Sequence, residues 1–194
     1  MLFRSTSDRT LRIVAFTLGQ AVVSTVATLV LGVPLAGIVS RLEMRGAAFV
    51  RVLVTVPFVL PTVVVASGFV ALAGPGGPLA GLGLVPSVVA VVLAHVVFNL
   101  AVVVRVVGAR WAGLDPEIAA AARVLGAGPL RVWTSVSAPL LAPAIAAAAA
   151  VVFCFCLTSF GVVLVLGGVG RATLETEIYR LTTQELAQIG RAHV

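Results

Sequence analysis

Residues 114–141 read LDPEIAAAARVLGAGPLRVWTSVSAPLL and lie between two of the most apolar stretches of the chain. No Asp, Glu, Lys or Arg occurs in residues 52–104 or in residues 132–170. Each of these runs is longer than the roughly 20 residues with which a helix spans a bilayer. The charged segment between them therefore predicts a connection at a membrane surface, joining helices that cross the membrane.

The composition of the whole chain agrees with a membrane protein. Hydrophobic residues make up 60% of the chain and charged residues only 10%, whereas a soluble globular chain carries about 25% charged residues. Arg12 is the one charged residue in residues 11–39, and this first run is too long for a cleavable signal peptide and lacks a clear cleavage site. We predict an all-α integral membrane protein, a bundle of several spans.

The apolar runs divide the chain into spans and connections. We expect a membrane domain over residues 13–166, with a connecting loop at 108–139 and the last span broken at Gly161. The four expected spans are residues 13–39, 52–73, 87–107 and 141–166. The segments outside this domain are an extracytoplasmic tail at 1–12, an extracytoplasmic polar segment at 167–187, and residues 188–194.

The arginines predict the orientation of the spans. Cytoplasmic loops carry an excess of positive charge, so the loops holding Arg41, Arg45, Arg51, Arg105, Arg110, Arg123 and Arg131 are expected in the cytoplasm. This places the N-terminal tail outside although it also carries arginines, and a preceding span absent from this chain would resolve the conflict. The last residues, QIGRAHV, match the translation of a common sequencing-library adapter. We therefore expect a truncated fragment with a tail, 188–194, foreign to the natural protein.

The net charge of +6 comes from thirteen arginines, with no lysine. The arginines are spread singly over the loops, which is typical of membrane anchoring and not of nucleic-acid binding. A phosphate-binding P-loop requires a lysine, so a partner would have to do any ATP-driven work, and no cofactor is expected in this chain. Cys154 and Cys156 are two residues apart and point to nearly opposite helix faces. They are expected to be small core residues and not ligands of a metal.

Residues 115–131, which we call the elbow, predict two short helices joined at a glycine. Asp115 suits the N-cap of the first helix, Pro116 its first turn and Glu117 the positive end of its dipole. Gly126 predicts a left-handed stop, and Gly128-Pro129 starts the second helix, which leads through Pro139 into the next span.

The first helix of the elbow presents a narrow face of small residues at helical spacing, which comprises Ile118, Ala121, Ala122 and Leu125. Such a face fits closely into a groove of another protein. It also fits an interfacial connector whose arginines touch lipid phosphates. The residues alone leave both interpretations open.

A few polar and helix-breaking residues fall inside the spans. His95 and Asn99 are four residues apart and share a helix face, so they either line a polar path or join helices by hydrogen bonds; we favour the second. Ser159 is open to the same two interpretations. Pro57 and Pro61 predict a bend in the second span, which either shapes a path or serves packing.

The elbow resembles the EAA loop of permease subunits in binding-protein-dependent ABC importers, which reads Glu-Ala-Ala, three residues, Gly, nine residues, Ile, one residue, Leu-Pro. The matching positions are Ala121, Ala122, Gly126 and Pro139, with Val136 in place of Ile. The departures are Ala120 in place of Glu and Ala138 in place of Leu. The stretches VPFVLPTVVVASG (56–68), LAHVVFNL (93–100) and TSFGVVLVLGGVGRATLETEIY (158–179) are similar to permeases of the thiamine and ferric-iron group.

The resemblance implies a type I (MetI-like) importer permease in the bacterial inner membrane, which transports a solute and is not itself an enzyme. Its elbow would be a cytoplasmic coupling helix seated in an ABC ATPase dimer. A periplasmic or lipid-anchored binding protein would deliver the solute, and a second permease half, in the same or another chain, would complete the path. The contact residues implied are Asp115, Glu117, Ala120, Ala121, Ala122, Arg123, Gly126 and Pro139. Thiamine is the expected solute, with ferric iron, polyamines or sulfate as alternatives.

Two other classes of membrane protein fit less well. A secondary transporter needs intramembrane carboxylates for ion coupling, and the expected spans contain none. An intramembrane serine protease needs a Ser–His pair, for which Ser159 and His95 are the candidates. The flanking residues Thr-Ser-Phe-Gly lack the Gly-x-Ser-x-Gly type of framing, so this remains a distant alternative.

Overall fold

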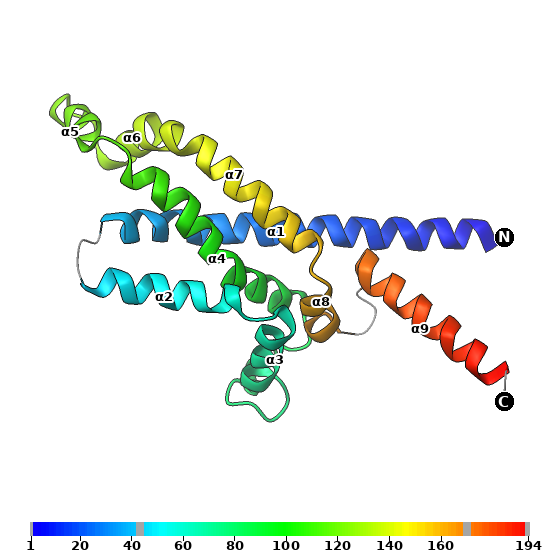
Figure 1. Ribbon diagram of the computed structural model, residues 1–194. Coiled ribbons are helices and arrows are strands. Elements are labelled where there is room, and N and C mark those ends of the chain that lie inside the picture. The colour runs from blue at the N-terminus through cyan, green and yellow to red at the C-terminus, as the bar shows by residue number, and fades with distance from the viewer. Residues whose placement is uncertain (1, 42–44, 169–171, 193–194) are drawn as a thin grey trace.

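The computed structural model describes residues 2–41, 45–168 and 172–192, and within them it shows helices and no strand (Figure 1). The all-α prediction is thus confirmed. In chain order the helices are α1 (Leu2–Arg41), α2 (Arg45–Val59), α3 (Thr62–Ala73), η1 (Ala80–Leu82), α4 (Val88–Ala112), α5 (Pro116–Val124), α6 (Pro129–Val132), η2 (Trp133–Ser137), α7 (Ala138–Leu157), α8 (Phe160–Leu166) and α9 (Leu174–Ala192).

Some sequence-based expectations concern residues whose side chains the structure does not describe. They include three of the loop arginines used for the orientation, Arg41, Arg45 and Arg51, and the predicted foreign tail, residues 188–194. The structure gives the backbone at Arg41, Arg45, Arg51 and residues 188–192 but not their side chains, so these expectations lie outside the described side chains.

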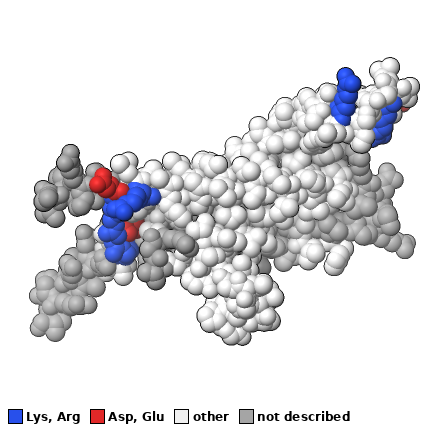
Figure 2. Space-filling model, turned by 180° about the vertical axis from the view of Figure 1, so that it is seen from behind, with Lys and Arg blue, Asp and Glu red and all other residues white. Residues whose placement is uncertain are grey.

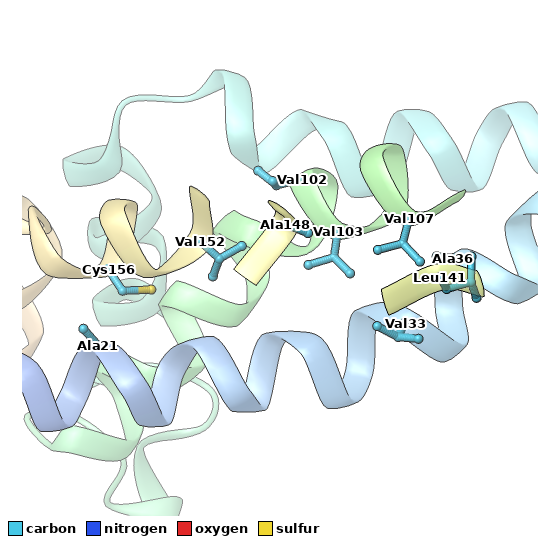
Figure 3. Close-up of a cluster of buried hydrophobic side chains, with 10 residues drawn as sticks. All are labelled: Ala21, Val33, Ala36, Val102, Val103, Val107, Leu141, Ala148, Val152 and Cys156. Carbon is cyan, nitrogen blue, oxygen red and sulfur yellow. The ribbon is translucent and has the colours of Figure 1, made fainter. Parts of the chain in front are cut away.

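The centre of the bundle consists of α1, α4 and α7, which pack against one another. Ten buried side chains from these three helices form one core cluster, drawn in Figure 3. The contact between α1 and α4 is close because Gly32 has no side chain: a Cβ atom there would lie 2.7 Å from Cγ1 of Val103. Small residues allow such close backbone approach between membrane helices, where packing drives association.

Within the part of the chain that the structure describes, three helices are long and apolar enough to cross a membrane: Asp8–Ser40, Val88–Ala112 and Pro129–Leu157. A fourth candidate is broken, since Val52–Val59 and Thr62–Ala73 meet at an angle of 110°. The sequence predicts a bend at Pro57 and Pro61. The structure has the bend at Pro61, the N-cap of α3, whereas Pro57 lies inside α2. Pro61 has no N–H to extend a helix, but its carbonyl accepts hydrogen bonds from Val64 N and Val65 N of α3.

A second break separates α7 from α8 at Thr158 and Ser159. The sequence predicts a break at Gly161, which instead lies inside α8. The structure gives this glycine another role: a Cβ atom there would lie 2.9 Å from Cγ2 of Val63 in α3. The two helices that follow the breaks, α3 and α8, therefore pack against each other.

On the face shown in Figure 2, the charged side chains of the described residues lie at the two ends of the molecule, with an uncharged band between them. The elbow lies at one end, and the start of α1 and α9 lie at the other (Figure 1). This distribution suits a protein whose middle is in the hydrocarbon core, because buried charges are costly there.

Candidate functional site

The first arm of the elbow, α5, begins as its sequence predicts. Asp115 is the N-cap, and its Oδ1 accepts a hydrogen bond of 2.9 Å from the backbone N–H of Glu117. Pro116 occupies the first turn, where its missing N–H has no helical partner to lose. Glu117 adds a negative charge at the positive end of the helix dipole. All three side chains are exposed, so local sequence alone suffices to start this helix.

The first arm ends at Val124, Leu125 is its C-cap, and Gly126 follows in the left-handed conformation with φ +83°. The N–H of Gly126 donates to Arg123 O at 2.9 Å, and the N–H of Ala127 donates to Ala122 O at 3.0 Å. Nothing lies within 4 Å of the position that a Cβ of Gly126 would take. The glycine is therefore required by the backbone conformation and not by crowding.

The second arm of the elbow is continuous with a membrane span. Gly128 is the N-cap of α6 and Pro129 its first residue, as the sequence predicts. However, α6 runs on through the π-helical turn η2 directly into α7, and Pro139 lies in the first turn of α7. A displacement of this arm is thus a displacement of the span itself. The sequence predicts two short helices, whereas the structure has one short helix and the extended end of a long one.

The first arm leaves its surface uncovered. Ile118 is 47% exposed, and Val124 and Leu125 are each 87% exposed. Ala120 and Ala121 are exposed as well, while Ala122 is half-buried. Sequence reasoning identified the alanine face but missed Val124, which the pattern of small residues does not include. The uncovered apolar tip is chemically suited to a groove in another protein.

A hydrogen-bonded group inside the bundle joins the polar side chains that the sequence singled out. His95 of α4 is 2% exposed. Its Nδ1 lies 2.9 Å from Ser24 Oγ of α1, and its Nε2 lies 2.6 Å from Ser159 Oγ at the break between α7 and α8. The amide of Asn99 donates to His95 O at 3.0 Å and to Cys156 Sγ at 3.6 Å. We call these five side chains the polar cluster.

The geometry of the polar cluster favours the interpretation that these residues join helices. Each ring nitrogen of His95 has a hydrogen-bond partner from a different segment. A buried polar group with such a partner stabilises the folded protein, whereas a buried polar group without one destabilises it. Gln20 of α1 adds a further link, since its Nε2 donates to Cys156 O at 2.8 Å. Sequence reasoning missed Gln20 and Ser24. Their spacing of four residues on α1, repeated at Thr28, was the available signal.

The remaining residues predicted for the interior are not part of this cluster. Pro57 is half-buried within α2, and Pro61 is exposed at the break before α3. Cys156 is buried as predicted, but Cys154 is exposed, because residues two positions apart on a helix face opposite ways. Among the residues that the structure describes, no group of three His, Cys, Asp or Glu side chains is placed to hold a metal.

The polar cluster does contain a Ser–His pair, Ser159 and His95, as a serine protease would require. The second ring nitrogen of His95, however, pairs with the hydroxyl of Ser24. In a protease that position belongs to a group, usually a carboxylate, that orients the histidine and stabilises its charged form. Ser159 is also 7% exposed. The ring and both hydroxyls are thus buried within the bundle, as expected of side chains that join helices.

At the end of the molecule opposite to the elbow, the ion pair between Arg9 and Glu177 joins α1 to α9, and a second pair, between Glu177 and Arg180, lies within α9. Glu177 lies 2.8 Å from Arg9 and 2.8 Å from Arg180. The hydrogen bonds from Arg180, with the positive charges of Arg180 and Arg9, hold the pKa of Glu177 below its usual value. Beside this carboxylate is a cleft of about 740 Å³ between α1, α8 and α9, where Arg9, Arg12 and Arg180 also lie.

The fold and the elbow define the class of this protein. The chain belongs to the family of binding-protein-dependent transport system inner membrane components, which matches residues 28–190. It is thus a permease of an ABC importer, as its EAA-like loop predicts. The relatives of this chain are transport subunits and not enzymes.

Particular relatives are named for two solutes. The chain is 37% identical to the molybdenum transport system permease protein ModB of Mycobacterium tuberculosis over 180 residues, which cover 86% of this chain and 67% of that protein. It is 32% identical to ModB of Azotobacter vinelandii, and the match covers 84% of this chain and 75% of that protein. It is 28% identical to the thiamine transport system permease protein ThiP of Brucella suis, covering 87% of this chain and 33% of that protein. The chain therefore spans about two thirds of the first relative and a third of the last.

Proposed function

We propose that this chain lines half of the path by which an ABC importer moves its solute across the bacterial inner membrane. A second permease half completes the path, and a binding protein delivers the solute at the end opposite to the elbow. A cytoplasmic ATPase dimer binds the elbow and supplies the force. The observation that carries this proposal is the continuity of the second arm of the elbow with α7, because a rigid helix carries a local displacement into the membrane.

The ATPase contact is assigned to the exposed side of the first arm. Val124 and Leu125 supply the apolar contact, and Arg123 and Glu117 supply charge beside it. The EAA-like pattern has Ala120 where the family pattern has Glu. Since Ala120 is exposed on this arm, the partner surface opposite it is expected to lack the polar group that a glutamate would pair with.

For the solute we propose molybdate, in place of the thiamine expected from the sequence. Relatives named for molybdenum share 37% and 32% identity with the chain, against 28% for relatives named for thiamine. The uncharged runs 13–40, 52–104 and 132–170 also contain no carboxylate. An anion such as molybdate meets no repulsion there, whereas a cation such as thiamine finds no opposite charge. Thiamine remains the second candidate because the ThiP relatives match over nearly the same length.

Uptake into proteoliposomes tests this proposal. The full-length permease is reconstituted with its ATPase and binding protein, and labelled molybdate and labelled thiamine are supplied in parallel. We expect ATP-dependent accumulation of molybdate and none of thiamine. A complex whose ATPase carries a substituted P-loop lysine is the control and should accumulate neither. Accumulation of thiamine alone would overturn the solute assignment, and accumulation of either solute without ATP would overturn the proposed function.

A further inference from the structure

Two tryptophans close the base of the elbow. Trp111 lies in the last turn of α4, just before the elbow, and Trp133 begins η2, just after it. Their rings are stacked, with centroids 5.5 Å apart and planes 19° apart. Aromatic pairs in this geometry attract each other beyond the effect of burial alone. The point where the chain leaves the bundle is thereby fixed to the point where it returns.

The stacked pair rests on α1 at a glycine. A Cβ atom at Gly37 would lie 2.7 Å from Cη2 of Trp111 and 2.9 Å from Cζ3. Separations below 3.0 Å are essentially never seen for real Cβ atoms, so any side chain at Gly37 must push the indole away. Both indoles also pack against the core cluster of Figure 3. The pair thus links the three central helices: Trp111 belongs to α4 and rests on α1, and Trp133 belongs to the turn that continues into α7.

The first arm itself is less firmly held than the base of the elbow. A cavity of about 460 Å³ lies beneath α5, and its lining includes Ser40 of α1, Trp111 of α4, Ile118 of α5 and Val136 of η2. No residue of α5 is buried. Close-packed interiors transmit displacement. A displacement of α5 therefore reaches the bundle through the stacked tryptophans at the base of the elbow and not across the cavity.

We propose that Trp111 and Trp133, seated on Gly37, form the joint that carries movement of the elbow into α1, α4 and α7 together. The proposal rests on the proposed function, since it assumes that the ATPase moves the elbow. The three residues act as positioning residues: none of them needs to touch the ATPase or the solute. The joint depends on the contact between the Trp111 ring on α4 and Gly37 on α1. It therefore predicts that a substitution at Trp111 can compensate for one at Gly37.

A suppressor experiment tests this contact. Gly37→Ala in the reconstituted importer should lower the solute transported per ATP hydrolysed by about 2- to 30-fold, the range found for residues along coupling networks. Trp111→Phe shortens the ring on the side that faces Gly37. The double variant Gly37→Ala with Trp111→Phe should therefore transport as well as Trp111→Phe alone. Gly19→Ala is the matched control, because Gly19 also lies in α1 and nothing is within 4 Å of its Cβ position.

Two further readouts separate the joint from its alternatives. Gly37→Ala should still bind the ATPase and hydrolyse ATP, and its melting temperature in detergent should not follow the loss of transport. If Gly37→Ala transports normally, or if transport falls only in proportion to stability, the joint is refuted while the proposed function stands. If the unsubstituted permease transports without binding the ATPase, the proposed function fails instead. Loss of transport that Trp111→Phe does not suppress would also overturn the joint.

Discussion

Gly126→Val is expected to uncouple transport from ATP hydrolysis without preventing membrane insertion. A β-branched residue at φ +83° is strained by about 1–3 kcal/mol, because the left-handed region brings Cβ close to the backbone. The arm would relieve this strain by turning away from its native direction. If the coupling free energy falls by the same amount, the solute transported per ATP hydrolysed falls by about 5- to 150-fold. The measurement is solute transported per ATP hydrolysed in proteoliposomes.

The elbow contains its own control for this substitution. Gly128 has φ −65° and ψ 166°, which a residue before proline readily adopts, and its Cβ position is equally open. Gly128→Val should therefore retain most of the transport. Gly126→Asn should be intermediate, since asparagine tolerates the left-handed region better than valine does. Equal transport by Gly126→Val and Gly128→Val would show that the angle of the elbow does not matter.

The second large effect is expected from His95→Leu. The leucine would leave Ser24 Oγ and Ser159 Oγ without the partners that they have at 2.9 and 2.6 Å. A buried polar group left unpaired costs about 1–3 kcal/mol, although interhelical hydrogen bonds within membranes average about 0.6 kcal/mol. We therefore expect a loss of about 1–3 kcal/mol in total, seen as a lower melting temperature of the complex in detergent.

Further variants decide between joining helices and lining the path. If His95 joins helices, His95→Gln should recover part of the stability, and its KM for the solute should stay at the native value. If His95 lines the path, the same variant should change KM and leave the melting temperature unaltered. Ser24→Ala and Ser159→Ala each remove one bond, and their effects should not add to that of His95→Leu because the three side chains form one network. An unchanged melting temperature for His95→Leu would contradict the assigned role.

The local structure of the elbow could be predicted because its signals are local. Asp115 caps α5 through its own neighbour Glu117, and Gly126 adopts the left-handed conformation that a helix stop needs. The apolar runs likewise predict membrane helices, since their length must match the bilayer. His95, Asn99 and Ser159 were recognisable as polar residues in apolar surroundings. Each of these inferences needs only nearby residues in the chain.

The remaining features depend on contacts between distant segments, which a single sequence does not reveal. The break before α8 lies at Thr158 and Ser159, while the glycine that suggests a break, Gly161, is needed for contact with α3. The stacking of Trp111 on Trp133 follows from the return of the chain after the elbow. The functional roles of the elbow residues stay predictions, because their partner is another protein.

The most direct test of the central claim, that the first arm docks on the ATPase, is site-specific cross-linking. Val124→Cys, at an 87% exposed position, is introduced after replacement of Cys154 and Cys156, and Ile178→Cys on α9, 61% exposed, is the control at the opposite end. We expect Val124→Cys to cross-link to the ATPase with a yield that changes when ATP is added, and Ile178→Cys to give no such product. Reaction of Val124→Cys with a membrane-impermeant thiol reagent from outside intact cells would contradict the account.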